Sequence, residues 1–241
     1  MEKNEFIKEL SDAFEYNGLG HVINGEKAEK LYCFAQILKE TNKQFNLTAI
    51  TDDEGIILKH FLDCATVIDL LPTNSSVIDV GCGAGFPSLP IAILREDVMV
   101  TSLDSTAKKI NFINETAEKL EITNIIAITS RAEDHAKIKR ESYDLAISRA
   151  VARLNILSEI CVPLVKKGGG FIAMKASKGD EEYNEAKKGL EVLGCQIEEH
   201  LKVHLEYKLE SVDREIFIFK KRKVTPTQYP RNYSQITKKP L

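Results

Sequence analysis

The most constraining feature of this sequence is a short apolar run that leads into three alternating glycines, Val77-Ile-Asp-Val-Gly-Cys-Gly-Ala-Gly-Phe-Pro87. The apolar residues predict a buried parallel strand, and the glycines predict a tight turn after it. Without Cβ atoms at Gly81, Gly83 and Gly85, the backbone can adopt unusual φ and ψ angles and a ligand can approach the main chain closely. The segment therefore predicts either a site for a nucleotide-like cofactor or a strand-to-helix turn that binds nothing.

A second apolar segment, at residues 98–103, ends in Asp104, nineteen residues beyond Gly85. A carboxylate at this position can accept hydrogen bonds from the two hydroxyls of a ribose. The glycine pattern is G-x-G-x-G rather than the G-x-G-x-x-G of dinucleotide enzymes, and Asp79 precedes it by two residues. An acidic residue there would repel a pyrophosphate and suit a cationic amino acid group. The pattern favours S-adenosylmethionine over a nicotinamide cofactor.

Length and composition agree with one large domain and a modest extension. The chain has 241 residues, of which 43% are hydrophobic, and no apolar run approaches the ~20 residues of a membrane helix. Its charged start, Met1-Glu-Lys-Asn-Glu5, differs from a signal peptide. The five cysteines are scattered without metal-ligand spacing, which predicts reduced thiols, no disulfide and no metal. We expect a cytoplasmic protein without membrane contact, and a monomer because no coiled-coil seam is present.

Charge is distributed unevenly along the chain. The net charge is −3, but no Asp or Glu follows Glu215, so the last residues carry +7 and residues 1–215 carry −10. A cluster of Lys and Arg on an acidic body can bind nucleic acid phosphates, although a solvated terminus is an equally good interpretation. Three prolines together with Tyr229 and Tyr233 predict an extended tail that becomes ordered only on a partner.

The periodicity of apolar residues changes near residue 73. Helical spacing predicts helices around 6–14, 28–38 and 52–70. Strands are predicted afterwards at 76–80, 98–103, 125–130, 143–148 and 170–175, with helices near 88–95, 105–120, 152–166 and 179–193. This alternation predicts an α/β fold of the Rossmann-like, doubly wound kind, with a mostly parallel sheet and right-handed crossovers.

The end of the chain predicts a different kind of pairing. Strand-like segments at 195–206 and 214–220 flank a polar turn at 210–213 and predict a terminal antiparallel hairpin. The chain thus divides into an N-terminal helical extension (1–72), a main α/β domain (73–223) and a basic, proline-containing C-terminal tail (224–241).

Charged residues follow three consecutive predicted strands, at the edge where an open α/β sheet binds its ligands. They are Arg131, Arg149 and Lys175. Each alone could be a helix cap or a salt-bridge partner, but together they suggest an anionic substrate. Glu133 also follows the third strand, where its carboxylate could meet the edge of an adenine.

The residues after the fourth strand argue against two targets of methylation, the exocyclic amine of adenine and C5 of cytosine. Ile147-Ser-Arg-Ala150 stands where enzymes that methylate exocyclic amines of adenine commonly place Asn or Asp, then Pro-Pro and an aromatic residue. Methylation of cytosine C5 needs a cysteine nucleophile at a strand end, but Cys161 lies in a predicted helix and Cys82 in the glycine turn. A target with a lone pair and no proton, such as guanine N7, needs only alignment and no general base. The sequence is consistent with that target without selecting it.

Seven segments, in order, resemble the bacterial small-subunit ribosomal RNA guanine-N7 methyltransferase family RsmG, formerly called glucose-inhibited division protein B. The segments are Phe45–Ile50, Lys59–Asp63, Val77–Pro87, Leu103–Ser105, Ser130–Glu133, Ile147–Ala150 and Ala173–Lys175. The resemblance covers nearly the whole chain. It implies a class I S-adenosylmethionine-dependent methyltransferase that acts on N7 of a guanine in 16S rRNA, with the RNA, the small ribosomal subunit or an assembly intermediate as its partner.

The resemblance also implies site residues. The family's cofactor contacts map onto Gly81, Phe86, Ala132, Glu133 and Arg149, and the turn and ribose arguments add Gly83, Gly85 and Asp104. The candidates for substrate binding are Arg131, Arg149, Lys175, Asn46 and His60, the last two with helix capping and packing as the alternative. No catalytic residue is assigned, because the chemistry is one of positioning. A methyltransferase of a protein or small molecule, and a non-catalytic module that binds S-adenosylmethionine and RNA, are the alternatives.

Overall fold

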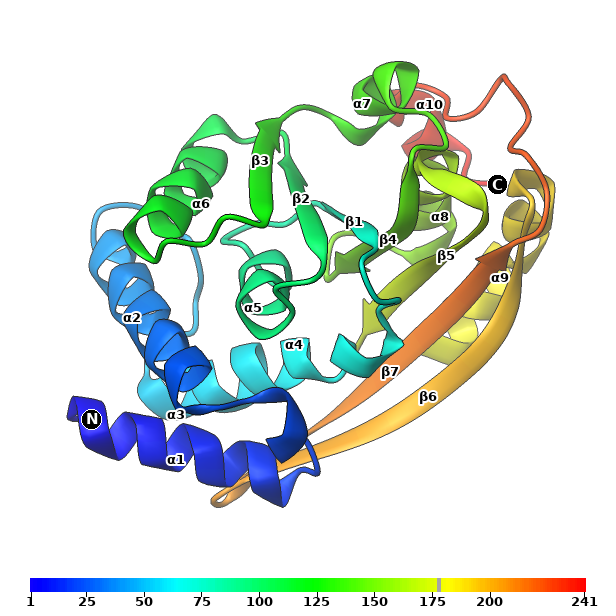
Figure 1. Cartoon of the computed structure of the whole chain (residues 1–241). Helices are drawn as coiled ribbons and strands as arrows, with labels where there is room; N and C mark the ends of the chain where they lie inside the picture. Colours follow the sequence, from blue (N-terminus) through cyan, green and yellow to red (C-terminus); the bar gives the residue numbers. More distant parts are fainter. Residues whose placement is uncertain (177–178) are drawn as a thin grey trace.

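The computed structural model describes residues 1–176 and 179–241 and is built on one seven-stranded sheet (Figure 1). The strands are β1 Ser76–Val80, β2 Met99–Asp104, β3 Ile125–Thr129, β4 Tyr143–Arg149, β5 Val165–Lys175, β6 Cys195–Tyr207 and β7 Glu210–Lys221. Their order is β3-β2-β1-β4-β5-β7-β6. The first five strands pair in parallel, and β7 is antiparallel to both β5 and β6. The predicted Rossmann-like fold with a terminal antiparallel hairpin is confirmed.

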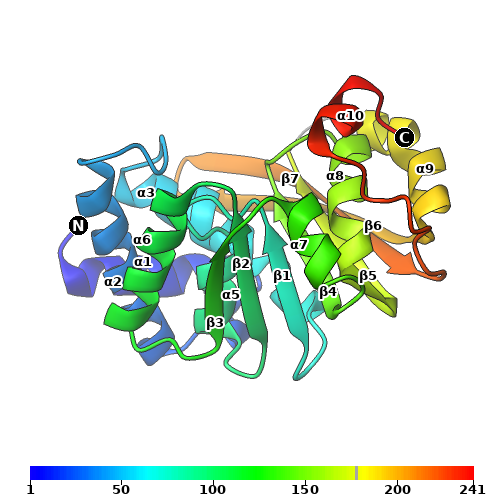
Figure 2. The ribbon, with the colours of Figure 1, turned by 90° about the horizontal axis from the view of Figure 1, so that it is seen from above.

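Helices cover both faces of this sheet (Figure 2). The helices of the α/β domain are α5 Ser88–Leu94, α6 Ala107–Lys119, α7 Ala132–Ile138, α8 Leu154–Cys161 and α9 Gly179–Leu193. One buried cluster contains residues of α5, α6 and the N-terminal helices, and the other contains residues of α7, α8 and α9. Neighbouring residues of β1 divide between them, with Val77 in the first and Ile78 in the second. A strand buried on both faces is continuously apolar, which explains why the apolar runs predicted the strands.

The N-terminal region is helical and packs on one face of the sheet. Its elements are α1 Lys3–Tyr16, η1 Gly20–Val22, α2 Gly25–Asn42, α3 Asp53–Ile56, η2 Ile57–Leu62, α4 Asp63–Ala65 and η3 Ile68–Leu70. Asn24 caps α2, and Asp52 caps α3 by accepting a hydrogen bond from the backbone N–H of Gly55. The predicted helix at 52–70 is therefore present, but its middle, η2, is π-helical.

Register places the glycine turn and Asp104 side by side. Val80 pairs with Leu103 across β1 and β2, and Asp104 pairs with Thr129 across β2 and β3. The carboxyl ends of these parallel strands therefore meet at one edge of the sheet, where the residues that follow them can line a common site.

Two predicted elements differ from the structure, and one helix of the structure has no predicted counterpart. The helix predicted at 152–166 ends at Cys161, because Pro163 stands in a 3-10 turn, η4 Val162–Leu164, and β5 begins directly after it. The hairpin turns at Lys208 and Leu209 rather than at 210–213, since Tyr207 already pairs with Glu210. The helix α7 was not predicted.

The C-terminal tail also differs from its prediction, because it folds onto the domain instead of extending from it. Residues Tyr233–Lys238 form a helix, α10, whose Ile236 is fully buried. Of the seven positive charges after Glu215, three pair with carboxylates on other elements: Lys221 at the end of β7 with Glu141, Arg222 with Glu198, and Arg231 in the tail with Glu159. None of the helices in the described part of the chain combines the length and apolarity of a membrane span.

Candidate active site

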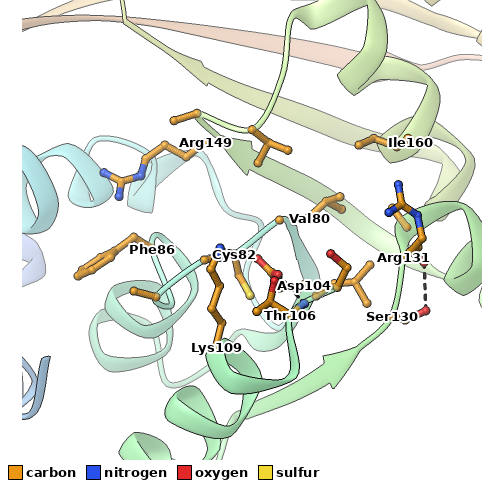
Figure 3. A pocket seen from close by; sticks show the side chains of 18 of the residues that line it. Val80, Cys82, Phe86, Asp104, Thr106, Lys109, Ser130, Arg131, Arg149 and Ile160 are labelled. Atoms are coloured by element: carbon orange, nitrogen blue, oxygen red, sulfur yellow. Dashed lines mark hydrogen bonds and ion pairs between the residues drawn. The ribbon is translucent and has the colours of Figure 1, made fainter. Parts of the chain in front are cut away.

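A cavity of about 520 Å³ lies at the carboxyl ends of β1 to β4 (Figure 3). Its walls come from the glycine turn, from the residues after β2, β3 and β4, from the N-terminal region and from the tail. The N-terminal region contributes Leu47, Thr48 and His60, and the tail contributes Tyr233. This is the position at which open α/β sheets bind their ligands.

The glycine turn has the backbone conformation that its sequence predicts. Gly81, Gly83 and Gly85 have φ values of +76°, +57° and +85°, which residues with a Cβ atom rarely adopt. A Cβ on Gly81 would lie 2.5 Å from a methyl group of Val151, whereas a Cβ on Gly83 would meet nothing within 4 Å. Gly81 is therefore required by packing, and Gly83 leaves the main chain open to the cavity.

Asp104 connects the end of β2 to the glycine turn. Its Oδ2 accepts a hydrogen bond from the backbone N–H of Gly83 at 3.1 Å, and its Oδ1 accepts one from the N–H of Thr106 at 2.8 Å. A carboxylate oxygen can accept a second hydrogen bond. The position predicted to hold a ribose thus retains acceptor capacity on the cavity wall.

Asp79 is fully buried beneath the glycine turn. Its Oδ2 accepts a hydrogen bond from the backbone N–H of Ser88 at 3.1 Å, and its Oδ1 has no hydrogen-bond partner among the described residues. Burial raises the pKa of this carboxyl to about 7, against the opposing hydrogen bonds from Ser88. A buried carboxylate oxygen without a donor fits a cationic ligand group, such as the amino group of S-adenosylmethionine.

The residues after β3 form the opposite wall. Arg131 Nε donates to Glu133 Oε1 at 2.6 Å, and the guanidinium carbon of Arg131 lies 4.5 Å from the centre of the Tyr233 ring. Glu133 is buried, and Ala132 and Glu133 both line the cavity. These predicted cofactor residues are therefore brought together with Gly81, Phe86 and Asp104 in one cavity.

Arg149, at the end of β4, is held by the N-terminal region. Its Nη1 donates to Asp63 Oδ2 at 2.8 Å and to the carbonyl of Lys59 at 3.1 Å. Asp63 is almost fully buried and also accepts a hydrogen bond from Arg214 Nε at 2.9 Å. Asp63 thus holds the guanidinium groups of both Arg149 and Arg214. The guanidinium carbon of Arg149 lies 5.4 Å from the centre of the Phe86 ring.

His60 stacks on Phe86, with ring centroids 4.1 Å apart and planes inclined by 13°. Its Nε2 lies 3.0 Å from Thr48 Oγ1, and its Nδ1 lies 3.3 Å from Arg149 Nη2. Burial and the charge of Arg149 lower the pKa of this imidazole to about 3. His60 is therefore neutral at physiological pH.

Two predicted substrate residues lie outside the cavity lining in the described part of the chain. The Lys175 ammonium is buried, forms an ion pair with Glu182 at 2.7 Å and donates to the carbonyl of Ala152 at 2.5 Å. Asn46 is exposed on the loop that carries Leu47 and Thr48. The three cations predicted to bind an anionic substrate are therefore all paired with carboxylates: Arg131 with Glu133, Arg149 with Asp63 and Lys175 with Glu182.

Cysteine chemistry does not fit this cavity. Cys82 lines it, but burial raises the pKa of its thiol far above the usual value. Cys161 is fully buried in α8, and burial raises its pKa as well. A thiolate nucleophile needs the opposite environment, which agrees with the prediction that neither residue attacks a substrate.

The site contains residues that the sequence did not reveal. Asp63 supports one wall of the cavity by accepting a hydrogen bond from Arg149. Tyr233 lines the opposite wall directly. Asp63 follows His60 by three residues, a spacing that places both on one side of a helix, and this was an available signal. Tyr233 carried no such signal, because its partner Arg131 lies in a distant part of the sequence.

The fold and this cavity define a Rossmann-like class I S-adenosylmethionine-dependent methyltransferase. Two solved structures share the fold at low sequence identity. P. horikoshii TYW2 in complex with MeSAdo has a TM-score of 0.55 at 15% identity, covering 67% of this chain and 62% of that one. M. jannaschii TYW2 in complex with AdoMet has a TM-score of 0.54 at 14% identity, covering 72% and 79%.

Sequence comparison gives the family. The model of the GidB family, rRNA small subunit methyltransferase G, matches residues 27–212. The protein named Ribosomal RNA small subunit methyltransferase G from Clostridium perfringens (strain SM101 / Type A) is 46% identical over 100% of both chains. Its namesake from Clostridium botulinum (strain ATCC 19397 / Type A) is 43% identical over 98% of this chain and 99% of its own. This chain belongs to the rRNA small subunit methyltransferase G family.

Proposed function

We propose that this protein transfers the methyl group of S-adenosylmethionine to N7 of a guanine in 16S ribosomal RNA in the cytoplasm. The observation that carries the proposal is the family match over residues 27–212, on a chain whose cavity combines the open glycine turn with Asp104 and in which the buried Asp79 comes two residues before that turn. The relatives' name states a small-subunit RNA as the object of methylation. The guanine N7 position comes from the family resemblance.

Different residues of the site would bind different parts of the cofactor. S-adenosylmethionine, when bound, supplies a methyl group on a positively charged sulfur. Asp104 would accept hydrogen bonds from the ribose, and Asp79 Oδ1 would accept one from the amino group. Gly83 would allow the ligand to approach the main chain, and Glu133 would lie beside the adenine. The acidic groups suit a ligand that is cationic at one end.

The other end of the cavity suits a target that carries no proton. Phe86, the neutral imidazole of His60 and the guanidinium of Arg149, which is paired with Asp63, gather there. Both nitrogens of His60 already lie near protein partners. Guanine N7 has a lone pair and needs no general base, so these groups have only to exclude water and orient the base.

The substrate assignments are part of the proposal. Arg149 and His60, at the end of the cavity near Phe86, would face the target base, and Arg131, on the cavity wall at the other end, would face the RNA. Asn46 would reach the RNA from its exposed loop. Lys175 is too enclosed to act as a free cation, so it would act by fixing the loop after β4 through the carbonyl of Ala152.

The proposal is tested with small ribosomal particles from cells that lack this protein. The protein, labelled S-adenosylmethionine and these particles are incubated, and the RNA is digested to nucleosides. Label in 7-methylguanosine supports the proposal. Label in another nucleoside contradicts the target, and label recovered outside the RNA points to a protein or small-molecule substrate. Cofactor binding without any transfer favours a non-catalytic module. Parallel reactions with naked 16S rRNA distinguish RNA from a particle as the substrate.

A further inference from the structure

The C-terminal tail reaches the cavity although it comes last in the chain. Its helix α10 lies beside α7 and α8 in both overall views (Figures 1 and 2). Tyr233, the first residue of α10, lines the cavity, and the guanidinium of Arg131 lies over its ring. The family match ends at residue 212, so this wall lies beyond the matched segment.

Strong interactions hold the tail in this position. Arg231 donates to the fully buried Glu159 from its backbone N at 2.9 Å, from Nε at 2.8 Å and from Nη2 at 2.5 Å. Arg140 donates to the backbone carbonyls of Tyr229, Thr225 and Pro226 at 2.6, 2.7 and 3.0 Å. Carbonyls that accept from one guanidinium fix the path of the main chain, so Tyr233 is presented by an anchored segment.

The position of Tyr233 along the cavity indicates which part of a ligand it meets. Phe86 and Arg149 lie at one end and Arg131 and Ile160 at the other, with Asp104 between them (Figure 3). If the ribose lies at Asp104 and the amino acid part lies toward Asp79, the nucleobase points toward Arg131. Tyr233 belongs to this nucleobase end.

We propose that the tail completes the cofactor site and that the Tyr233 ring packs against the adenine. An aromatic ring and a nucleobase attract each other through their faces, and Arg131 holds the Tyr233 ring by a cation–π contact. Tyr233 is thus a cofactor-binding residue. The inference rests on the proposed function, because it assumes that this cavity binds S-adenosylmethionine.

The inference is tested by calorimetric titration of the full chain with three ligands. These are S-adenosylmethionine, S-adenosylhomocysteine and 5′-methylthioadenosine, which keeps the adenosine but lacks the amino acid. We expect Tyr233→Ala to raise the Kd of all three by about tenfold. Tyr233→Phe keeps the ring and should stay within about twofold of the wild type. Gln235→Ala, on the exposed side of the same helix, is the matched control and should not change any Kd.

The outcomes separate this inference from the function on which it rests. Equal Kd values for the wild type and Tyr233→Ala overturn it, even if the variant methylates RNA more slowly, since Tyr233 would then contact RNA. A loss shared equally by Tyr233→Phe also overturns it, because the hydroxyl and not the ring would be responsible. A wild type that binds none of the three ligands overturns the proposed function and this inference together.

Discussion

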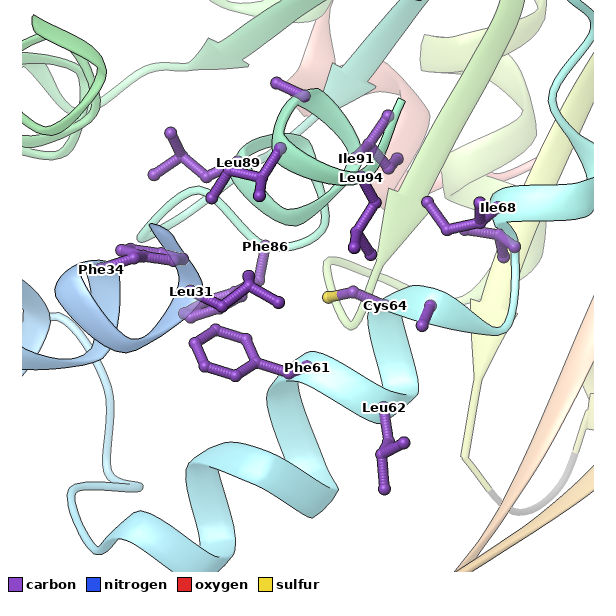
Figure 4. Close-up of a cluster of buried hydrophobic side chains, with 14 of the residues drawn as sticks. Leu31, Phe34, Phe61, Leu62, Cys64, Ile68, Phe86, Leu89, Ile91 and Leu94 are labelled. Carbon is purple, nitrogen blue, oxygen red and sulfur yellow. The ribbon is translucent and has the colours of Figure 1, made fainter. Parts of the chain in front are cut away.

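The two segments outside the sheet domain both reach the cavity, but different interactions hold them there. The N-terminal region buries an aromatic and aliphatic cluster against the glycine turn and α5 (Figure 4). The Phe34 ring lies near the rings of Phe86, Phe61 and Phe112, with centroids 5.1, 5.9 and 6.4 Å away. The tail has few buried apolar side chains, chiefly Ile236, and depends on Arg140 and Arg231.

This difference determines whether each segment unfolds with the domain or detaches from it locally. Apolar packing is shared among many side chains and grows with the buried area, so the N-terminal region should unfold together with the domain. The tail depends on a few polar contacts made by Arg140 and Arg231. Its detachment would hydrate those groups without opening the core. We therefore expect the N-terminal region to belong to the global folding unit and the tail to open locally.

Removal of an aromatic ring from the N-terminal cluster should have the largest effect. Phe34→Ala leaves a cavity in a fully buried cluster and should lower the free energy of unfolding by about 4 kcal/mol. Urea denaturation measures this change, with Tyr16→Ala as the control at a mostly exposed aromatic residue. A loss below about 1 kcal/mol, or a second transition at low urea, would show that the N-terminal region is not part of the global unit.

Removal of the tail's main anchor should act locally. Arg231→Ala leaves the buried Glu159 carboxylate without its partner, which costs about 3 kcal/mol unless the tail detaches and water reaches the carboxylate. We expect amide hydrogen exchange in residues 225–241 to accelerate by about a hundredfold, with global stability reduced by less than about 1 kcal/mol. Lys239→Ala, in the same tail, is the control. Faster exchange throughout β1–β5 would contradict the comparison, because the tail would then be part of the global unit.

The contrast between apolar packing and isolated polar contacts also explains which parts of the fold could be predicted from the sequence. Apolar periodicity predicted the strands and the first three helices, because burial repeats at the spacing of each element. It missed α7, which is only seven residues long and carries four charged or histidine side chains. The hairpin turn was misplaced because Lys208 and Leu209 are not usual turn residues, although Lys208 adopts a φ of +55° there.

The site was predictable where its residues are close in sequence. The glycine turn and Asp104 follow directly from their own strands. Asp63 and Arg149 are 86 residues apart, and such a pairing has no period that a single sequence can reveal. The prediction of an extended tail was wrong for a related reason. The number of charges in the tail does not show that a buried carboxylate of the domain, Glu159, pairs with Arg231.

A change of pH should distinguish the two ends of the cavity. Burial raises the pKa of Asp79 from its ordinary 3.8 to about 7, so the carboxyl of the free protein is partly protonated at pH 7. A cationic amino group binds the ionised form, so the affinity for S-adenosylmethionine should weaken as the pH falls below 7, by at most about tenfold per unit. Calorimetric titration from pH 6 to 8 measures this dependence. 5′-Methylthioadenosine, which lacks the amino group, should show none.

Asp79→Asn is the matched variant for this titration, and its stability gives a second measurement. It should remove the pH dependence of S-adenosylmethionine binding; a slope that persists in this variant assigns the titration to another group. Because the folded-state pKa is raised, the contribution of Asp79 to stability is complete below pH 3.8 and is lost as the pH rises through 7. Asp79→Asn should therefore be more stable than the wild type at pH 8, while it binds the cofactor less tightly.

The smallest expected effect concerns the end of the cavity that the N-terminal region forms. His60→Phe keeps a ring stacked on Phe86 but loses the contacts of the imidazole with Thr48 and Arg149. We expect the rate of methyl transfer to fall by about threefold, which corresponds to less than 1 kcal/mol, with the Kd of S-adenosylmethionine unchanged. The pKa of His60 is about 3, so the imidazole is neutral from pH 6 to 8, and the variant should keep the shape of the wild-type pH–rate profile. A profile that loses an inflection near neutral pH would instead show that His60 exchanges a proton during the reaction, and the N-terminal region would then supply chemistry as well as a wall.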